Sequence, residues 1–220
     1  MGVLQTFLDL IFPPRCVFCR KLLGRGENSY CAGCAQNLPY TEKGGAQTGE
    51  HFTICVSPLY YDGVVRDSIH RFKFKDASGY AKGYAQLIAD CIRENLGERG
   101  ERYDFISWVP LSADRLKSRG YDQAMLLAMA TALCLDDVAV ETLRKHTDVP
   151  AQSGVGDREK RRENISGVYE ARDPELIADK RILLIDDIVT TGSTLSECAL
   201  TLLRAGASEV LCATLARTED

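Results

Sequence analysis

The segment that most restricts the possible fold is a hydrophobic run followed at once by two acids, a hydroxyl-rich turn and a helix-forming stretch. It spans residues 182–194 and reads Ile-Leu-Leu-Ile-Asp-Asp-Ile-Val-Thr-Thr-Gly-Ser-Thr. A short apolar run of this kind is typical of a strand buried on both faces of a parallel sheet. Because ligands bind beyond the carboxyl ends of strands in open α/β sheets, we expect Asp186 and Asp187 to lie at a ligand site.

The rest of the chain alternates predicted strands with predicted helices. We expect strands at 53–61, 105–109, 138–143, 181–185 and 209–215, and helices at 64–74, 81–96, 124–135 and 193–205. Apolar residues recur at helical spacing in the second of these helices, where they form one stripe. Strands that alternate with helices of this length predict an α/β fold with a mostly parallel sheet flanked by helices.

The loop after the acidic pair is suited to a phosphate group. It presents backbone N–H groups and the hydroxyls of Thr190, Thr191, Ser193 and Thr194 at the start of a helix, and Gly192 permits a close backbone approach. The alternative is an acidic helix cap without a ligand, since Asp and Thr are ordinary N-caps. The motif exceeds what a cap requires, so we favour a ligand with a phosphate and nearby vicinal hydroxyls, such as a ribose 5-phosphate.

Four of the nine cysteines form two Cys-x-x-Cys pairs, Cys16 with Cys19 and Cys31 with Cys34. Two such pairs, separated by residues 20–30, match the spacing of a zinc ribbon and complete a tetrahedral shell. Four cysteine ligands leave no position for water or substrate, so the zinc is expected to be structural. A redox dithiol or an iron–sulfur cluster is the alternative, although a redox dithiol leaves the second pair unexplained.

The five remaining cysteines lie in apolar segments: Cys55, Cys91, Cys134, Cys198 and Cys212. We expect them to be small buried hydrophobic residues, because no disulfide framework of a small secreted protein is visible. This usage of cysteine is typical of a reducing compartment, and we expect a cytoplasmic protein. The formal net charge of −4 and the pI near 5.5 provide no global basic field of the kind that marks nucleic-acid binders.

A polar, glycine-rich stretch at 41–50 predicts a linker or an exposed loop. We therefore expect an N-terminal helix and zinc ribbon at 1–45 and a larger domain at 46–220. Residues 3–12 lack the basic region of a signal peptide and predict a short amphipathic element packed on the body, with peripheral membrane contact as the alternative. No apolar run approaches the roughly 18 residues of a membrane span.

The segment 182–194 resembles the phosphoribosyl-pyrophosphate-binding motif of type I phosphoribosyltransferases along its whole length. Further upstream, Val109-Pro110-Leu111 leads into Arg115, Lys117, Arg119-Gly120-Tyr121 and Gln123. With the four-cysteine ribbon, the chain resembles the ComF family, in which a zinc ribbon precedes a phosphoribosyltransferase-like domain. The resemblance covers essentially the full chain. Asp122 departs from the family's Arg-Gly-aromatic-Asn-Gln pattern, in which asparagine is usual.

The resemblance implies that Asp186 and Asp187 bind the ribose hydroxyls, help to organise a magnesium-bound ligand and belong to the catalytic centre. The rest of the implied ligand-binding motif is Ile188, Val189, Thr190, Thr191, Gly192, Ser193 and Thr194, of which 190–194 hold the 5-phosphate. Candidates for a pyrophosphate loop and a flexible loop are Arg115, Arg119, Gln152, Arg158 and Arg161. Cationic donors there would stabilise the leaving pyrophosphate, and the charged run 157–164 would close over the ligand, with a solvated charge run as the alternative.

For two other lysines, a solvent-facing position is favoured over the alternative of a ligand contact. Lys73 and Lys75 alternate with aromatic residues in Phe72-Lys73-Phe74-Lys75, and we expect both to lie on a solvent-facing element instead of contacting a ligand.

Three hypotheses of function stay open. The first is an enzyme that binds magnesium–phosphoribosyl pyrophosphate and transfers the phosphoribosyl group to a nucleophile, with release of pyrophosphate. The second is a non-catalytic factor that binds phosphoribosyl pyrophosphate or nucleotides and single-stranded DNA, because the ComF resemblance implies a role in natural competence or DNA utilisation. The third is an adaptor for other competence proteins. The candidate DNA contacts are Arg158, Lys160, Arg161 and Arg162, together with Arg115, Lys117 and Arg119. The alternative surface is the ribbon, with Arg15, Arg20, Lys21 and Arg25.

Overall fold

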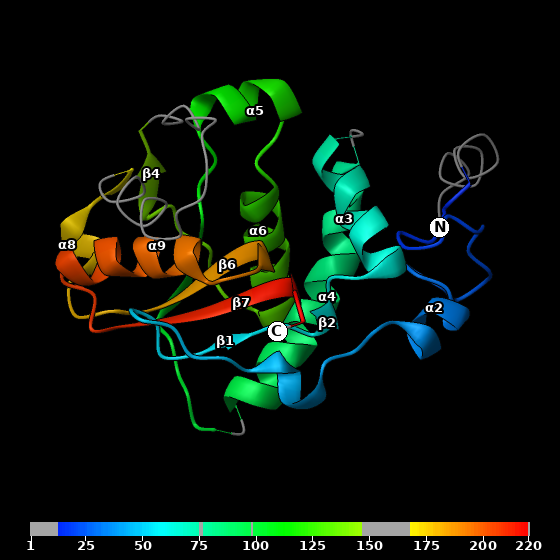
Figure 1. Ribbon diagram of the computed structural model, residues 1–220, viewed down its shortest axis with the longest axis horizontal. Coiled ribbons are helices and arrows are strands. Elements are labelled where there is room, and N and C mark those ends of the chain that lie inside the picture. Colours follow the sequence, from blue (N-terminus) through cyan, green and yellow to red (C-terminus); the bar gives the residue numbers. More distant parts are fainter. Residues whose placement is uncertain (1–12, 75–76, 98, 147–167, 220) are drawn as a thin grey trace, which may run out of the picture.

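The structure is a computed structural model that describes residues 13–74, 77–97, 99–146 and 168–219. At its centre lies a parallel sheet (Figure 1) that consists of β1 (Cys55–Val56), β2 (Leu59–Tyr60), β3 (Phe105–Trp108), β6 (Arg181–Val189) and β7 (Glu209–Arg217). The strand order is β1-β7-β6-β3, and β2 also pairs with β7. The two long strands β6 and β7 run side by side from the Arg181–Glu209 pair to the Val189–Arg217 pair.

Successive residues of the central strands pack on opposite faces of the sheet. Ile106, Leu183 and Ile185 belong to the hydrophobic core on one face, with α3 (Gly63–Phe74), α4 (Ala81–Ile92) and α6 (Gln123–Leu135). Phe105, Ile182 and Leu184 belong to the core on the other face, with α8 (Pro174–Ile177) and α9 (Ser193–Arg204). Because both faces are covered, the strands are apolar at most positions, as expected for a parallel sheet.

Short elements complete the described part of the chain. They are α2 (Ala32–Asn37), η1 (Glu42–Gly45), η2 (Ser78–Tyr80), the π-helical turn η3 (Arg93–Gly97), α5 (Ala113–Arg119), and the antiparallel strands β4 (Leu143–Lys145) and β5 (Tyr169–Ala171). Helix α5 follows β3 and lies above α6 in Figure 1. Ser112 caps its N-terminus by accepting a hydrogen bond from the Arg115 backbone N–H, and Gly120, with φ of 81°, ends it.

The predicted mostly parallel α/β fold and the four predicted helices are confirmed, with η3 completing the helix expected at 81–96. One strand was misplaced. The expected strand at 138–143 is replaced by β4, which starts at Leu143, and only Ala139 forms an isolated parallel bridge, with Ile106. Helix α5 was not expected, because it buries none of its residues and so shows no apolar stripe.

The stretch 41–50 is a partly exposed loop: Glu42, Lys43 and residues 48–50 are exposed as expected, but its middle is packed against the body. Gly44 and Gly45 are buried, the Ser57 backbone N–H donates to the Gly44 carbonyl, and Gln47 pairs with Cys55. This stretch therefore packs along the edge strand β1. Four of the five isolated cysteines are buried as expected, but Cys134 is partly exposed.

The four-cysteine segment packs on the same core as the sheet. Val17, Phe18 and Leu38 belong to the cluster that contains α3, α4 and α6, and the Phe18 ring lies 5.8 Å from the Tyr84 ring. Figure 1 shows α2 and the neighbouring N-terminal segment beside α3 at one end of the molecule. The expected element at 3–12 lies outside the described residues. Within the described ranges, no helix is long and apolar enough to cross a membrane.

Candidate functional site

The acidic pair lies near the carboxyl end of β6. The Asp187 backbone N–H donates to Asp186 Oδ1 at 2.8 Å, and Asp187 Oδ2 lies 2.8 Å from the ammonium nitrogen of Lys73 on α3. The side chains of Lys73 and Asp187 are only 21% and 12% exposed, so this ion pair is shielded from solvent. Lys73 therefore faces the site, and the prediction that it faces solvent was wrong.

The surroundings of Asp186 disfavour its ionised form. Burial, and then the negative charge of Asp187, raise the pKa of Asp186 to about 8, although the Asp187 N–H and the Lys73 ammonium act in the opposite direction. Asp122 adds a further negative charge nearby. A site with this excess of carboxylates is suited to a ligand that supplies hydroxyl donors or a cation.

The loop after β6 forms a small hollow at the N-terminus of α9. Residues 188–195 line it together with Asp186, and its volume is about 40 Å³. Gly192 has φ of 74°, which favours glycine, and the Thr191 and Ser193 hydroxyls lie 2.7 Å apart. Backbone N–H groups and hydroxyls at a helix N-terminus favour an anion here.

A second cavity of about 150 Å³ is lined by both residues of the acidic pair. Its cationic lining residues are Lys73, Arg115, Arg119 and Lys145. Asp186 and Thr194 line both this cavity and the hollow at α9. The two anion-suited spaces therefore meet at the acidic pair.

The wall beside β3 is held by Asp122. Its carboxylate accepts hydrogen bonds from the backbone N–H of Leu111 and of Met125, both at 3.0 Å, and so joins the turn after Pro110 to the N-terminus of α6. Burial is the main cause that raises the pKa of Asp122. An asparagine has only one acceptor oxygen and could not accept both bonds in the same way.

Arg119 is positioned by neighbours on both sides. Its guanidinium donates to Gln123 Oε1 at 2.8 Å and lies 5.1 Å from the centre of the Phe74 ring. Arg115 lies on the same short helix and lines the same cavity.

The structure thus brings Arg115 and Arg119 to the acidic pair and to residues 188–194, whereas Gln152, Arg158 and Arg161 lie outside the described residues. The ligand roles of all these residues stay predictions. Sequence reasoning missed Lys73 and also Lys145, which lines the cavity from β4. No local pattern distinguishes such lysines from solvent-facing ones, because β4 and α3 reach the site only in the folded chain.

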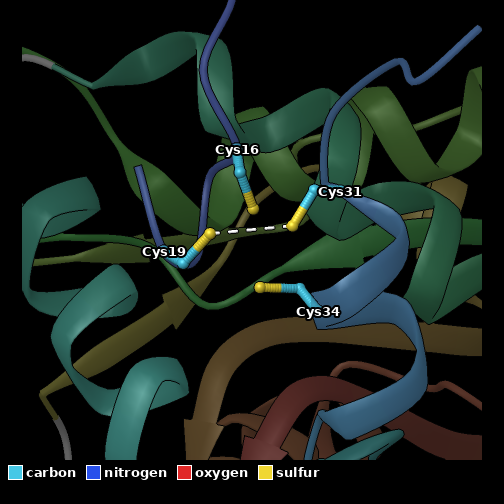
Figure 2. A group of neighbouring side chains, drawn as sticks. All are labelled: Cys16, Cys19, Cys31 and Cys34. Atoms are coloured by element: carbon cyan, nitrogen blue, oxygen red, sulfur yellow. Dashed lines mark hydrogen bonds between the residues drawn. The ribbon is translucent and has the colours of Figure 1, made fainter. Parts of the chain in front are cut away.

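The four cysteines of the N-terminal segment converge on one point, as Figure 2 shows. Their sulfur atoms all lie within 4.8 Å of one another, and Cys19 Sγ and Cys31 Sγ are 3.7 Å apart. Four sulfurs placed tetrahedrally at about 2.3 Å from a zinc ion are about 3.8 Å apart, so the geometry fits zinc.

The four thiols do not ionise equally: burial is the main cause that raises the pKa of Cys19 and of Cys34, whereas Cys16 is the thiol with a lowered pKa. Burial opposes its ionisation, but backbone hydrogen bonds from Cys19, Cys31 and Phe18 outweigh burial and lower the pKa of Cys16 to about 7. The thiolate is the form that binds metal. With four cysteines and no open position, a zinc ion here is structural.

Comparison with known proteins yields two family models. Residues 122–220 match the phosphoribosyl transferase domain, and residues 7–57 match the double zinc ribbon domain. The chain is 28% identical over 222 residues to "Competence protein F" of Haemophilus influenzae, and the match covers 92% of this chain and 96% of that protein. It is 27% identical over 228 residues to "DNA utilization protein YhgH" of Salmonella typhi, covering 95% and 99% respectively.

A solved adenine phosphoribosyltransferase is similar at 19% identity and a TM-score of 0.41, over 63% of this chain and 71% of that one. The parallel sheet and the matched domains define a phosphoribosyltransferase-like protein that carries a zinc ribbon. The zinc ribbon precedes the phosphoribosyl transferase domain, and the two relatives match nearly the whole chain, so the family can be named. The chain belongs to the ComF family.

Proposed function

We propose that the chain binds magnesium–phosphoribosyl pyrophosphate at the carboxyl edge of the sheet and transfers its phosphoribosyl group. The observation that carries this proposal is the junction at Asp186 of a hydroxyl-lined hollow and a cation-lined cavity. A ligand with a phosphate at one end, a diol in the middle and a pyrophosphate at the other matches this order. Residues 190–194 would hold the 5-phosphate, and Asp186 and Asp187 would accept from the ribose hydroxyls.

In the proposed reaction, the bond from ribose C1 to the pyrophosphate oxygen breaks, and pyrophosphate leaves with the bonding electrons. A nucleophile supplies the electron pair for the new bond to C1 and then loses its proton to solvent. Arg115, Arg119 and Lys145, which line the cavity, would donate to the oxygens on which negative charge accumulates. Asp186 and Asp187 offer the hard oxygen ligands that magnesium prefers, and bound magnesium would neutralise part of the pyrophosphate charge.

Isothermal titration calorimetry with phosphoribosyl pyrophosphate, with and without magnesium, tests the binding step. We expect magnesium-dependent binding that weakens about tenfold or more in Asp187→Asn, because a charge-assisted hydrogen bond is lost. Asp67→Asn is the matched control, since Asp67 is an exposed aspartate on α3. Unchanged affinity in Asp187→Asn would place the ribose elsewhere. Release of pyrophosphate on addition of candidate nucleobases tests the transfer step.

The second candidate function is binding of single-stranded DNA in DNA uptake or utilisation. The names of the two full-length relatives favour it, and so does α5, whose Arg115 and Lys117 are exposed at the rim of the cavity. Such binding would be independent of sequence and would weaken with salt, with a logarithmic slope of about −0.7 per phosphate contacted. Phosphoribosyl pyrophosphate should compete, because both ligands require Arg115.

Fluorescence anisotropy of a labelled oligothymidine across a salt series measures this binding. Lys117→Glu should weaken binding if α5 forms the surface, and Arg161→Glu with Arg162→Glu should do so if the charged run 157–164 contributes. Charge reversal of Arg20 and Lys21 should weaken binding instead if the zinc ribbon forms the DNA-binding surface. Binding that persists at high salt or ignores every reversal would exclude this electrostatic mechanism.

A further inference from the structure

Helix α3 connects the first cysteine pair to the acidic pair. We infer that Lys73 is a residue of the ligand site, and that the Cys16–Cys19 turn holds it there through Arg71. The inference rests on the proposed function for the identity of the ligand. It assigns the zinc ribbon a task beyond its own folding, which is to position one cation of the site.

At the inner end of this connection, the Lys73 ammonium lies 2.8 Å from Asp187 and lines the cavity together with Arg115 and Arg119. A lysine side chain is a flexible, strongly hydrated cation that returns to solvent unless its backbone is held in place. In this position it compensates the acidic pair and directs its remaining donors into the cavity. An anionic group bound in the cavity would therefore meet Lys73 directly.

At the outer end, the Arg71 guanidinium donates to two carbonyl oxygens of the turn between Cys16 and Cys19. The distances are 3.1 Å to Val17 and 2.6 Å to Phe18. Ser68, one helical turn earlier, also donates to the Val17 carbonyl. These carbonyls are fixed when the flanking cysteines bind a common metal ion, so the turn is a rigid anchor for the last turns of α3.

Between Arg71 and Lys73, Phe72 anchors the end of α3 in the hydrophobic core. Its side chain is fully buried, and its ring lies 5.4 Å from the Tyr84 ring and 5.8 Å from the Tyr121 ring. The Tyr121 hydroxyl donates to the Phe72 carbonyl, and Tyr121 directly precedes Asp122, which accepts a hydrogen bond from the cavity-lining Leu111. The end of α3 is thus clamped between the ribbon and the wall of the site.

A double-mutant cycle tests this connection without changing a metal ligand or a residue of the phosphate hollow. Lys73→Met, Arg71→Met and the double variant are compared by calorimetry with magnesium–phosphoribosyl pyrophosphate, and zinc is counted by metal analysis. We expect Lys73→Met to lower affinity about tenfold or more, since a charged donor is lost. Arg71→Met should lower affinity severalfold while zinc is retained, and should have no further effect when Lys73 is already replaced by methionine.

Two further variants distinguish positioning from general damage. Arg71→Lys keeps one donor and should restore part of the affinity, and it replaces Arg71→Met if that variant does not fold. Arg66→Met is the control, because Arg66 lies on α3 with its side chain 60% exposed. If Arg71→Met weakens binding equally in both backgrounds, or not at all, Arg71 does not act through Lys73 and the inference is overturned.

A measurement without ligand separates this inference from the proposed function. The coupling between Lys73 and Asp187, obtained from unfolding of Lys73→Met, Asp187→Asn and their combination, should be present in the wild-type background and largely lost with Arg71→Met. If Arg71→Met leaves the coupling energy between Lys73 and Asp187 unchanged, the ribbon does not position Lys73 and the inference is refuted. Wild-type protein that binds no phosphoribosyl pyrophosphate would refute the proposed ligand, whereas the placement would then be judged by the coupling alone.

Discussion

Replacing the two neighbouring aspartates separately should change stability in opposite directions. Asp187→Asn removes the charged partner of a shielded lysine, whereas Asp186→Asn removes a carboxylate whose ionised form is disfavoured. Both substitutions preserve side-chain volume. Asp186 and Asp187 are adjacent and identical in chemistry, so the difference in sign comes from Lys73, which forms its ion pair with Asp187.

The expected magnitudes follow from the contacts. For Asp187→Asn, the charge-assisted bond to Lys73 contributes about 1.5–3 kcal/mol, and relief of repulsion with Asp186 offsets part of it, which leaves a net loss of about 1 kcal/mol. For Asp186→Asn, each unit by which the folded-state pKa exceeds the ordinary value of 3.8 corresponds to ~1.4 kcal/mol. Asp186 keeps some contact with solvent, which screens much of this effect, so we expect a gain of about 1 kcal/mol or more at pH 8.5.

The pH dependence has a definite sign. Because burial and Asp187 raise the pKa of Asp186 from 3.8 to about 8, the folded protein holds a proton between these values that the unfolded chain has released. The contribution of Asp186 to the free energy of unfolding therefore falls as pH rises from 3.8 to about 8. The advantage of Asp186→Asn over wild type should grow across this window and stay constant above it.

Urea unfolding at several pH values measures these differences. Trp108, the single tryptophan, is buried at the end of β3 and reports on the sheet by fluorescence. Equal slopes of the unfolding transitions would show that the variants differ in stability and not in the extent of unfolding. If Asp186→Asn is less stable than wild type at pH 8.5, the raised pKa of Asp186 is wrong. If Asp187→Asn is more stable than wild type, the assignment of Lys73 to Asp187 is wrong.

Three further outcomes are expected. Cys31→Ser should lose zinc in metal analysis and lower the thermal midpoint of the whole protein, because Val17 and Phe18 belong to the core on which α3 and α4 pack; an unchanged midpoint would contradict this. Asp122→Asn should strengthen pyrophosphate binding severalfold at low salt in calorimetry, since a negative charge beside the cavity is removed, and weaker binding would mean that the bond to the Leu111 N–H matters more. Gly192→Ala should destabilise by about 1 kcal/mol in urea unfolding, because φ of 74° disfavours a side chain, and should weaken binding of inorganic phosphate; equal stability would show that the loop relaxes.

The local patterns of the chain were sufficient for most of the architecture. Apolar runs and helical spacing placed β3, β6, β7 and the helices α3, α4, α6 and α9, because the period of buried positions is set within each segment. The two Cys-x-x-Cys pairs predicted a zinc ribbon, since both ligands of a pair come from one tight turn. The roles of Asp186, Asp187 and residues 188–194, and the division of the chain after residue 45, stay predictions.

What only the tertiary structure decided concerns contacts between segments far apart in the chain. Lys73 and Asp187 meet because α3 packs over the carboxyl edge of the sheet, and Gly44 and Gly45 are buried because the stretch 41–50 runs beside β1. The ribbon joins the main core through Val17 and Phe18, which no local pattern indicated. A side chain at the edge of an apolar stripe has no local signal that shows whether water or another segment lies against it. Its partner, and with it the charge balance of the site, is set only when the helices pack on the sheet.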